Sequence, residues 1–340
     1  MSSPGLTDTS LADYIRPVLA ESHVSACAFL GNVAAFALGD GTVILAGGST
    51  TSRVNVHPDS AILVAASDGK YLVTGGDDGR VVRVDAAGKT EEIARAGNGA
   101  WIDAVAAGPD GAVAWSAGKK AHVRDGKGQM FALDIGSSGR GLAFATKGFQ
   151  LYIARYGGVT LWFPRTQGTP REVSWKGSHL DVTASPDGRF VVSTMQENEM
   201  HGWRLADGAN MRMSGYPSKV RSMSWSHDGK WLASSGADAA ITWPFMTKDG
   251  PMGKPPLELG IRSSRVERVA FHPSSPVLAV GYKDGCVLFV RMDADDEQIL
   301  QARAPGDGGA VSALAWSGDG KMLAFGTDEG AAGVLTLPQV

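Results

Sequence analysis

The alternation of apolar and polar positions between residues 220 and 245 predicts three short β-strands joined by tight turns. The stretch VRSMSWSHDGKWLASSGADAAITWPF contains an apolar run, a polar turn at Asp228-Gly229, a second apolar run, another turn near Asp238 and a third apolar run. An Asp-Gly pair between alternating apolar residues is a strong hairpin signal. One such sheet cannot bury both of its faces, so it has to stack on other sheets.

The same apolar spacing recurs along the chain. Val220, Met223 and Trp225 place apolar residues three and five positions after the first. Including this copy, eight units start near residues 24, 61, 102, 139, 179, 220, 266 and 311, and the copies at 139 and 179 are weaker. The first and last starts lie 287 residues apart over seven intervals, a mean of 41. A period of about 40 to 45 residues with four strands per unit indicates a propeller.

The turns repeat with the strands. Asp-Gly pairs separate the first and second strands at 68–69, 110–111, 187–188, 228–229 and 319–320. Similar pairs separate the second and third strands at 40–41, 78–79, 157–158 and 284–285. Third strands such as VTLWF (159–163) are apolar, whereas fourth segments such as REVSW (171–175) are more polar. The fourth segments therefore fit the outer edge of each sheet, where charge is tolerated.

Over residues 22 to 340 the chain resembles the WD40-repeat β-propeller family. It looks like a divergent, bacterial-type member of that family. The family's S-P-D-G turn stands at 185–188, with variants at 226–230 and 317–321, and its D-G-x-V phrase begins at Asp40, Asp78 and Asp284. The family's Gly-His pair and terminal Trp-Asp dipeptide are absent, and only His23 and His179 lie near the expected loop. We therefore expect the family's His-Ser-Asp-Trp hydrogen-bond network to be largely missing.

The resemblance implies an all-β fold, a single closed β-propeller over residues 13–340 with eight four-stranded antiparallel blades, preceded by a flexible segment at 1–12. Seven blades are the alternative, with an irregular first or fourth unit. The last unit supplies only three strands, and the family closes its ring by lending an N-terminal strand to the last blade. Residues 14 to 20 fit this strand, because Pro17 is tolerated at a sheet edge. Alternatively, a short helix capped by Thr9 or Ser10 replaces that strand.

Composition narrows the class of protein. The 340-residue chain has 45 glycines, a formal charge of -3 and two cysteines, Cys27 and Cys286, both within apolar runs. This favours a turn-rich fold without a disulfide framework and gives no overall attraction to nucleic acid or acidic membranes. The N-terminal residues do not read as a signal peptide, and no apolar run reaches membrane-spanning length. We expect a cytoplasmic protein.

The candidate chemistry does not predict an enzyme. There is no Gly-x-Ser-x-Gly elbow and no local metal-ligand spacing, so no catalytic, cofactor or metal residues are expected. We interpret His57, His227 and His272 as equivalent turn residues, and the Asp293, Asp295 and Asp296 run as a solvated face. The alternative function is a metal-binding or hydrolytic propeller with a site assembled across blades at the central cavity. Its strongest ligand set is His179, His201 and Glu199.

Partner binding is the better-supported function. Residues 200 to 254 are rich in Met, Trp and basic side chains, and residues 201 to 268 hold ten Lys and Arg against six Asp and Glu. Such types dominate interfaces, and a local charge of +4 favours an acidic patch on a protein partner. Insertions at 246–260 and 291–298 lengthen loops in units six and seven, where function tends to reside.

The sequence therefore predicts a non-catalytic scaffold that binds a protein partner through loops of one propeller face, chiefly in units five to seven. In the family's geometry, that face consists of the loops entering each first strand and the turns between second and third strands. The candidate contacts are Trp101, Arg140, His179, Glu199, Tyr216, Lys219, Arg221, Arg265 and Lys283. Among these, Lys219, Arg221 and Arg265 are predicted to bind the acidic patch of the partner.

Overall fold

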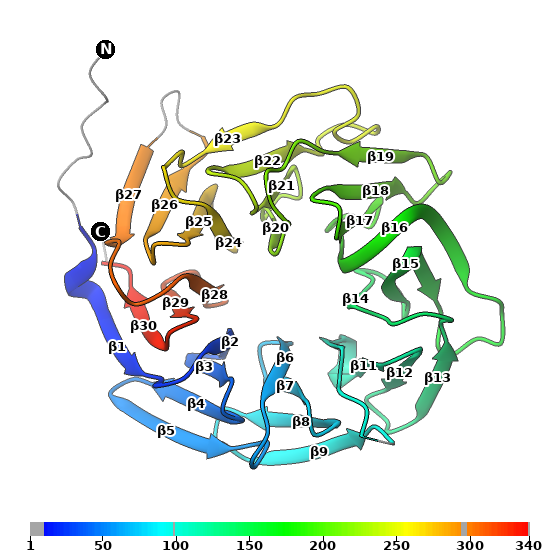
Figure 1. The fold of residues 1–340 in the computed structure, drawn as a ribbon, viewed down its shortest axis with the longest axis horizontal. Helices are drawn as coiled ribbons and strands as arrows, with labels where there is room; N and C mark the ends of the chain where they lie inside the picture. Colours follow the sequence, from blue (N-terminus) through cyan, green and yellow to red (C-terminus); the bar gives the residue numbers. More distant parts are fainter. Residues whose placement is uncertain (1–9, 98, 294–297, 339–340) are drawn as a thin grey trace. The chain divides into compact units, whose positions relative to one another are not determined.

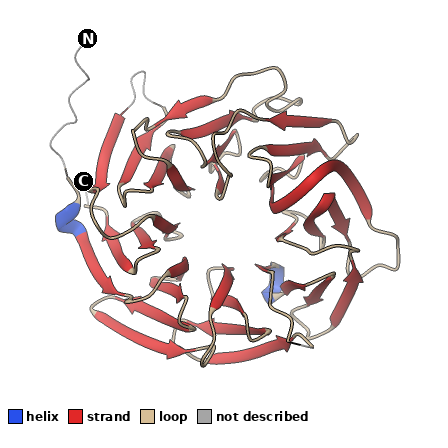
Figure 2. Ribbon diagram, in the orientation of Figure 1, coloured by secondary structure: helices blue, strands red, loops and turns tan. Residues whose placement is uncertain are grey.

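The computed structural model describes residues 10–97, 99–293 and 298–338, and their regular structure is almost entirely β-strand (Figure 2). The chain divides into two compact units. The terminal unit combines the N-terminal residues up to Cys27 with the chain from Arg221 onward, and the central unit runs from Ala28 to Val220. Of the predicted flexible segment 1–12, residues 1–9 lie outside the described part.

The central unit contains seventeen strands, most of which are labelled in Figure 1, together with one 3-10 helix. They are β3 (Val33–Leu38), β4 (Thr42–Gly47), β5 (Thr50–Asn55), β6 (Ile62–Ser67), β7 (Tyr71–Gly76), β8 (Arg80–Asp85), β9 (Thr90–Arg95), β10 (Ala104–Ala107), η2 (Pro109–Gly111), β11 (Val113–Ala117), β12 (Lys120–Arg124), β13 (Met130–Asp134), β14 (Gly141–Phe144), β15 (Leu151–Trp162), β16 (Arg171–Ala184), β17 (Phe190–Met195), β18 (Met200–Arg204) and β19 (Asn210–Met213). Strand β2 (Val24–Leu30) spans the division between the units and belongs to the sheet β2-β3-β4-β5.

The terminal unit contains a second 3-10 helix and three further sheets. Its elements are η1 (Ala12–Tyr14), β1 (Ile15–Leu19), β20 (Met223–Trp225), β21 (Trp231–Ser234), β22 (Ala240–Pro244), β23 (Leu257–Leu259), β24 (Val266–Phe271), β25 (Val277–Tyr282), β26 (Val287–Arg291), β27 (Gln298–Arg303), β28 (Val311–Trp316), β29 (Met322–Thr327) and β30 (Ala331–Thr336).

The prediction of eight separate four-stranded blades is wrong. In the described part of the chain the strands form seven sheets, six of four strands and one of six strands, β14-β15-β16-β17-β18-β19. The units expected near 139 and 179 share this sheet, because β16 pairs with β15 through its first half and with β17 through its second. Strand β15 likewise runs through Gly157-Gly158, where a turn was expected. Seven was the alternative count, and the fourth unit is the irregular one.

The core of each unit lies between neighbouring sheets. In the central unit the first strands of successive sheets touch, since β10 contacts both β6 and β14. In the terminal unit β24 contacts β20 and β28 in the same way. Apolar side chains from facing sheets fill the space between them. For example, Val73 and Ile102 pack in one cluster with Trp115. Stacked sheets therefore bury the apolar face that one sheet leaves open.

The prediction that an N-terminal strand completes the last sheet is confirmed. Strand β1 pairs antiparallel with β30, giving the sheet order β1-β30-β29-β28. Pro17 lies opposite Gly333 on this edge strand and is exposed. The alternative helix is also present in reduced form, because η1 precedes the strand and the Ser10 hydroxyl accepts the Ala12 amide at 3.2 Å.

A serine and an aspartate fix the repeated first hairpin turn. In the turn before Trp231, the Ser226 hydroxyl donates to Asp228 at 2.7 Å and accepts the Trp231 amide at 3.0 Å. The same pair of bonds recurs in the turns at 185–190 and 317–322. The glycine that follows the aspartate has φ of 68° at Gly229, a left-handed conformation that favours glycine. The Ser-x-Asp-Gly sequence that resembles the family's motif therefore stabilises its own turn through local hydrogen bonds.

Candidate interaction surfaces

In the terminal unit, backbone hydrogen bonds join successive loops into one row. We call it the terminal loop row and define it as residues 221–222, 235–237, 265–266 and 283–284. The Arg221 amide donates to the Ser235 hydroxyl at 3.0 Å, and the Gly236 amide donates to the Val266 carbonyl at 3.1 Å. The Lys283 amide then donates to the Arg265 carbonyl at 2.8 Å. The structure thus places Arg221, Arg265 and Lys283 along one fixed row.

The charges of this row are only partly compensated. Arg265 donates to the buried carboxylate of Glu267 at 2.7 Å, so its charge already has a partner. Arg262 and Asp284 form a second pair at 2.8 Å. Burial would raise the pKa of Asp284, but Arg262 and the Cys286 amide outweigh it and lower that pKa. Within the described residues, Arg221 and Lys283 are exposed and form no ion pair.

The neighbouring candidates Tyr216 and Lys219 lie at the end of the central unit. Tyr216 is only 8% exposed, so most of its ring is packed inside the protein. Lys219 is half-buried and forms no ion pair among the residues that the structure describes. Lys219 therefore has a free charge, whereas Tyr216 offers little accessible surface.

A second row of joined loops lies in the central unit. We call it the central loop row and define it as residues 101–103, 118–120, 139–140 and 154–156. Asp103 is its link, because one carboxylate oxygen accepts the Gly118 amide at 2.8 Å and the other accepts Arg140 at 3.1 Å. The Arg140 amide donates to the Ala154 carbonyl at 2.9 Å. Trp101 at one end is 64% exposed, and Tyr156 at the other is 57% exposed.

His179 and Glu199 lie inside the central unit and do not form part of an exposed face. His179 is 1% exposed, and its ring nitrogens bond to the Ser193 hydroxyl at 2.7 Å and the Trp175 carbonyl at 3.0 Å. Burial lowers the pKa of His179. Glu199 is 6% exposed and accepts Arg212 at 2.7 Å. Both side chains therefore have internal partners.

His201 completes this buried cluster. Its ring stacks on Trp175 with centroids 4.0 Å apart and meets the edge of Trp203 at 4.8 Å. Both ring nitrogens are buried, and neither meets a partner at hydrogen-bond geometry, although the Asn210 side chain acts on the ring and raises its pKa. Burial, followed by the charge of His179, lowers the pKa of His201 to about 4. Across the described part of the chain, no three His, Cys, Asp or Glu side chains converge as metal ligands, so His179, His201 and Glu199 are not brought together as a ligand set.

One polar network was missed by sequence reasoning. His57 is not in a first hairpin turn, because it follows β5 and lies in the loop before β6. Its Nδ1 lies 3.0 Å from an Asp78 oxygen and its Nε2 lies 2.9 Å from the Thr74 hydroxyl. Desolvation lowers the pKa of His57, and Asp78 opposes this shift. The sequence feature that could have indicated this network is the presence of Thr74 and Asp78, 17 and 21 residues after His57.

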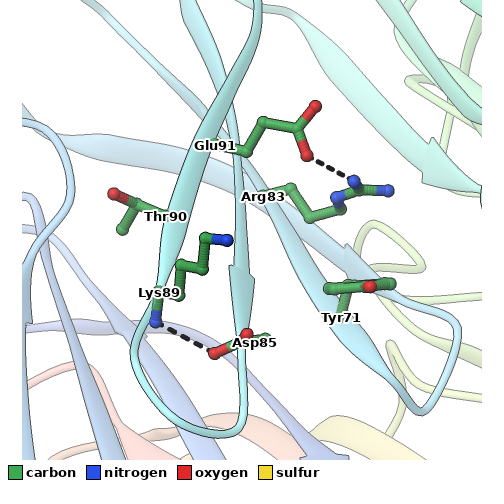
Figure 3. Close-up of a pocket in the computed structure, with 6 residues that line it drawn as sticks. All are labelled: Tyr71, Arg83, Asp85, Lys89, Thr90 and Glu91. Carbon is green, nitrogen blue, oxygen red and sulfur yellow. Dashed lines mark hydrogen bonds and ion pairs between the residues drawn. The ribbon is translucent and has the colours of Figure 1, made fainter. Parts of the chain in front are cut away.

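A shallow polar pocket lies on the second, third and fourth strands of the sheet β6-β7-β8-β9 (Figure 3). It has a volume of about 140 Å³ and is lined by Tyr71, Arg83, Asp85, Lys89, Thr90 and Glu91. Most of the charged side chains that line the pocket already form ion pairs or hydrogen bonds within the protein. Glu91 pairs with Arg83 and, at 2.8 Å, with Arg124 of the neighbouring sheet, while Asp85 accepts backbone amides of its own turn. This arrangement ties two sheets together.

Comparison with known proteins assigns these sheets to a family. Residues 269–337 match the WD40 domain of anaphase-promoting complex subunit 4, and residues 210–242 match the WD domain, G-beta repeat. The C-terminal WD40 domain of Sif2 superposes with a TM-score of 0.76 at 13% identity, covering 96% of this chain and 99% of that one. These matches support a WD40 β-propeller family for the chain.

One further solved structure shares the fold, and one curated protein shares sequence over part of the chain. The computationally designed Ika8 protein superposes with a TM-score of 0.75 at 20% identity, over 94% of this chain and 98% of that one. WD repeat-containing protein 1-B of Xenopus laevis is 30% identical over 115 residues. That match covers 33% of this WD40 chain and only 18% of the relative's own length.

The WD40 matches carry a coarse statement of function. WD40 propellers are in general scaffolds that bind other proteins and are typically non-catalytic. Among the described residues of this WD40 chain, no helix has the length and apolar character needed to cross a membrane.

Proposed function

We propose that this WD40 chain is a non-catalytic scaffold that binds an acidic patch of a protein partner, chiefly through the terminal loop row. The observation that carries the proposal is the pair Arg221 and Lys283. Both are exposed and without an ion pair in the described residues, on loops that backbone hydrogen bonds hold together.

Rigid loops favour this function for a physical reason. Side chains whose backbone is already fixed lose less conformational entropy when a partner binds, so more of the interaction energy appears as affinity. Unpaired cations also steer an acidic partner toward the row and discriminate against basic ones. Arg265 contributes less than the sequence suggested, because binding an acidic partner competes with its bond to Glu267. Lys219, in the central unit, also forms no ion pair among the described residues and is a proposed contact in its own right.

The same proposal includes a cytoplasmic location and no nucleic-acid or membrane partner. Its basis is the formal charge of -3, which gives no general attraction to polyanions. No observation in the described residues favours the alternative of a hydrolytic or metal-binding site.

The test is affinity purification from the native host, with partners identified and quantified by mass spectrometry. The variant Arg221→Glu/Lys283→Glu should lose a stoichiometric partner that the wild type retains. A matched control, Lys127→Glu/Lys321→Glu, makes the same charge change in exposed turns outside both loop rows and should retain it. Circular dichroism checks that both variants are folded. Equal recovery by both variants, or equal loss, would contradict the proposal.

A further inference from the structure

The turn between β8 and β9 and the turn between β12 and β13 are built in the same way. In each turn one oxygen of an aspartate, Asp85 or Asp125, accepts the backbone amides two and four residues later, at 2.9 to 3.0 Å. The second oxygen of Asp125 also accepts Arg165, which follows β15, at 3.0 Å. The second oxygen of Asp85 has no partner within the described residues. The position beside Asp85 therefore lacks the cationic group that its equivalent in the next sheet has.

The pocket that contains Asp85 also contains several donors without acceptors (Figure 3). Lys89 is exposed, and its ammonium group forms no ion pair in the described part of the chain. Arg83 donates one nitrogen to Glu91 and lies over the Tyr71 ring at 4.3 Å, so its other N–H groups remain available. The Tyr71 hydroxyl likewise has no hydrogen-bond partner among the described residues. These donors favour a ligand that carries an oxyanion.

The size and place of the pocket limit what it can bind. Its volume of about 140 Å³ is well below the ~300 Å³ at which pockets for drug-sized ligands begin, so it fits a molecule of a few heavy atoms. It lies at the turn between the third and fourth strands of its sheet. Both loop rows are formed instead by loops that enter first strands and by turns between second and third strands. The pocket is therefore separate from the surface proposed for a protein partner.

We propose that this pocket binds a small free amino acid. The ammonium group of the ligand donates to the second oxygen of Asp85, and its carboxylate accepts from Lys89 and Arg83. Hydrogen bonds between charged groups of this kind are the strongest that a small polar site can form. A simple anion would leave the Asp85 oxygen unpartnered and close to a like charge, and a simple cation would lie against Lys89 and Arg83. A zwitterion satisfies both sets of groups.

Isothermal titration calorimetry tests this proposal on the full chain at fixed ionic strength. The probes are free glycine, L-alanine, L-serine and L-aspartate, together with propionate and ethylamine, which are alanine without its ammonium group and without its carboxylate. We expect at least one of the four amino acids to bind with one site per chain. Propionate and ethylamine should bind at least tenfold more weakly than that amino acid, because each lacks one of the two charge-assisted contacts.

Three variants locate the site. Asp85→Asn keeps an oxygen for the two turn amides but removes the charge, and it should weaken amino-acid binding at least tenfold. Lys89→Gln should do the same, and the turn tolerates it because Gln129 stands at the equivalent position in the next sheet. The matched control Lys127→Gln removes an exposed lysine from that equivalent turn and should bind as the wild type does. Circular dichroism checks that the variants are folded.

Several results would overturn the proposal. If none of the four amino acids binds, Lys89 and Asp85 need no ligand. If propionate binds as well as the best amino acid, the pocket is a simple anion site, and equal binding of ethylamine would make it a simple cation site. Unchanged binding by Asp85→Asn or Lys89→Gln would place the ligand elsewhere. The variant Arg221→Glu/Lys283→Glu should bind the amino acid normally, so failure of the partner proposal is distinguishable from failure of this one.

Discussion

Replacing the buried ring of His201 with a side chain that does not titrate should make the protein less sensitive to acid. His201 is 0% exposed, and burial lowers its pKa from 6.5 to about 4, with His179 adding to the shift and Asn210 opposing it. In the unfolded chain the same ring is solvated and has its ordinary pKa. Between these two values the unfolded chain binds a proton that the folded protein does not.

The sign and size of the effect follow from this difference. The stability associated with neutral His201 is fully present above pH 6.5 and is lost as the pH falls from 6.5 toward 4, because acid then favours the unfolded chain. One pKa unit corresponds to about 1.4 kcal/mol, so at pH 5.5 the loss from this one group is about 1.4 kcal/mol. His57 and His179 also have lowered pKa values and contribute in the same direction.

The assay is urea unfolding at pH 8.0 and pH 5.5 for the wild type, His201→Leu and the exposed control His227→Leu. Leucine has nearly the volume of histidine, and no hydrogen bond of good geometry is lost on replacing His201. Between the two pH values, His201→Leu should lose about 1.4 kcal/mol less unfolding free energy than the wild type, because the contribution of His201 is missing from the variant. His227→Leu removes an exposed histidine and should change the acid sensitivity by much less than His201→Leu does. If the wild type and His201→Leu lose the same amount, His201 is not held neutral by burial and the reasoning is refuted.

Two further predictions concern the blades. Ser226→Ala removes both hydrogen bonds that hold its hairpin turn. It should lower the unfolding free energy, measured by urea titration, by about 1 to 3 kcal/mol. The control Ser214→Ala changes a surface serine and should alter this free energy by less than about 0.5 kcal/mol. Gly326→Ala would place its Cβ 2.4 Å from a Val24 methyl group and should cost about 1 to 3 kcal/mol by the same measurement. Gly318→Ala, with nothing within 4 Å, is the control, and equal losses for the two glycine variants would contradict the close packing of Gly326 against Val24.

The strands and most turns could be predicted from the sequence because they depend on local chemistry. Ser226 and Asp228 satisfy backbone groups of their own hairpin, so the S-x-D-G phrase predicts the turn wherever it occurs. The N-terminal strand was predictable for a similar reason, since an incomplete last sheet and a tolerated Pro17 indicate an edge strand. The number of separate sheets was not predictable. Gly157-Gly158 resembles a turn pair, yet here it lies within β15, and local spacing does not reveal whether a strand continues into the next unit.

The candidate site shows where local pattern stops being informative. Glu199 looks like a free carboxylate in the sequence, but the fold brings Arg212 to it from thirteen residues away. Tyr216 has an interface-type side chain, yet it is 8% exposed. Exposure and pairing depend on which strands become neighbours, and the repeat pattern alone does not give that. Trp101 and Arg140 illustrate the opposite outcome, because both were candidates and both are accessible.

The distribution of polar networks also bears on where this chain can bind. His57 keeps a buried network with Thr74 and Asp78, whereas His179 bonds to Ser193 and to the Trp175 carbonyl. Buried polar groups that are fully bonded rigidify their surroundings, since opening them leaves costly unpaired donors and acceptors. The loops that such networks anchor are therefore poor candidates for rearrangement on binding. Trp101, Arg221 and Lys283 extend from such anchored loops, and their side chains do not hold the loops in place. They can therefore contact a partner without disturbing the fold, which is why the proposed experiments change Arg221 and Lys283.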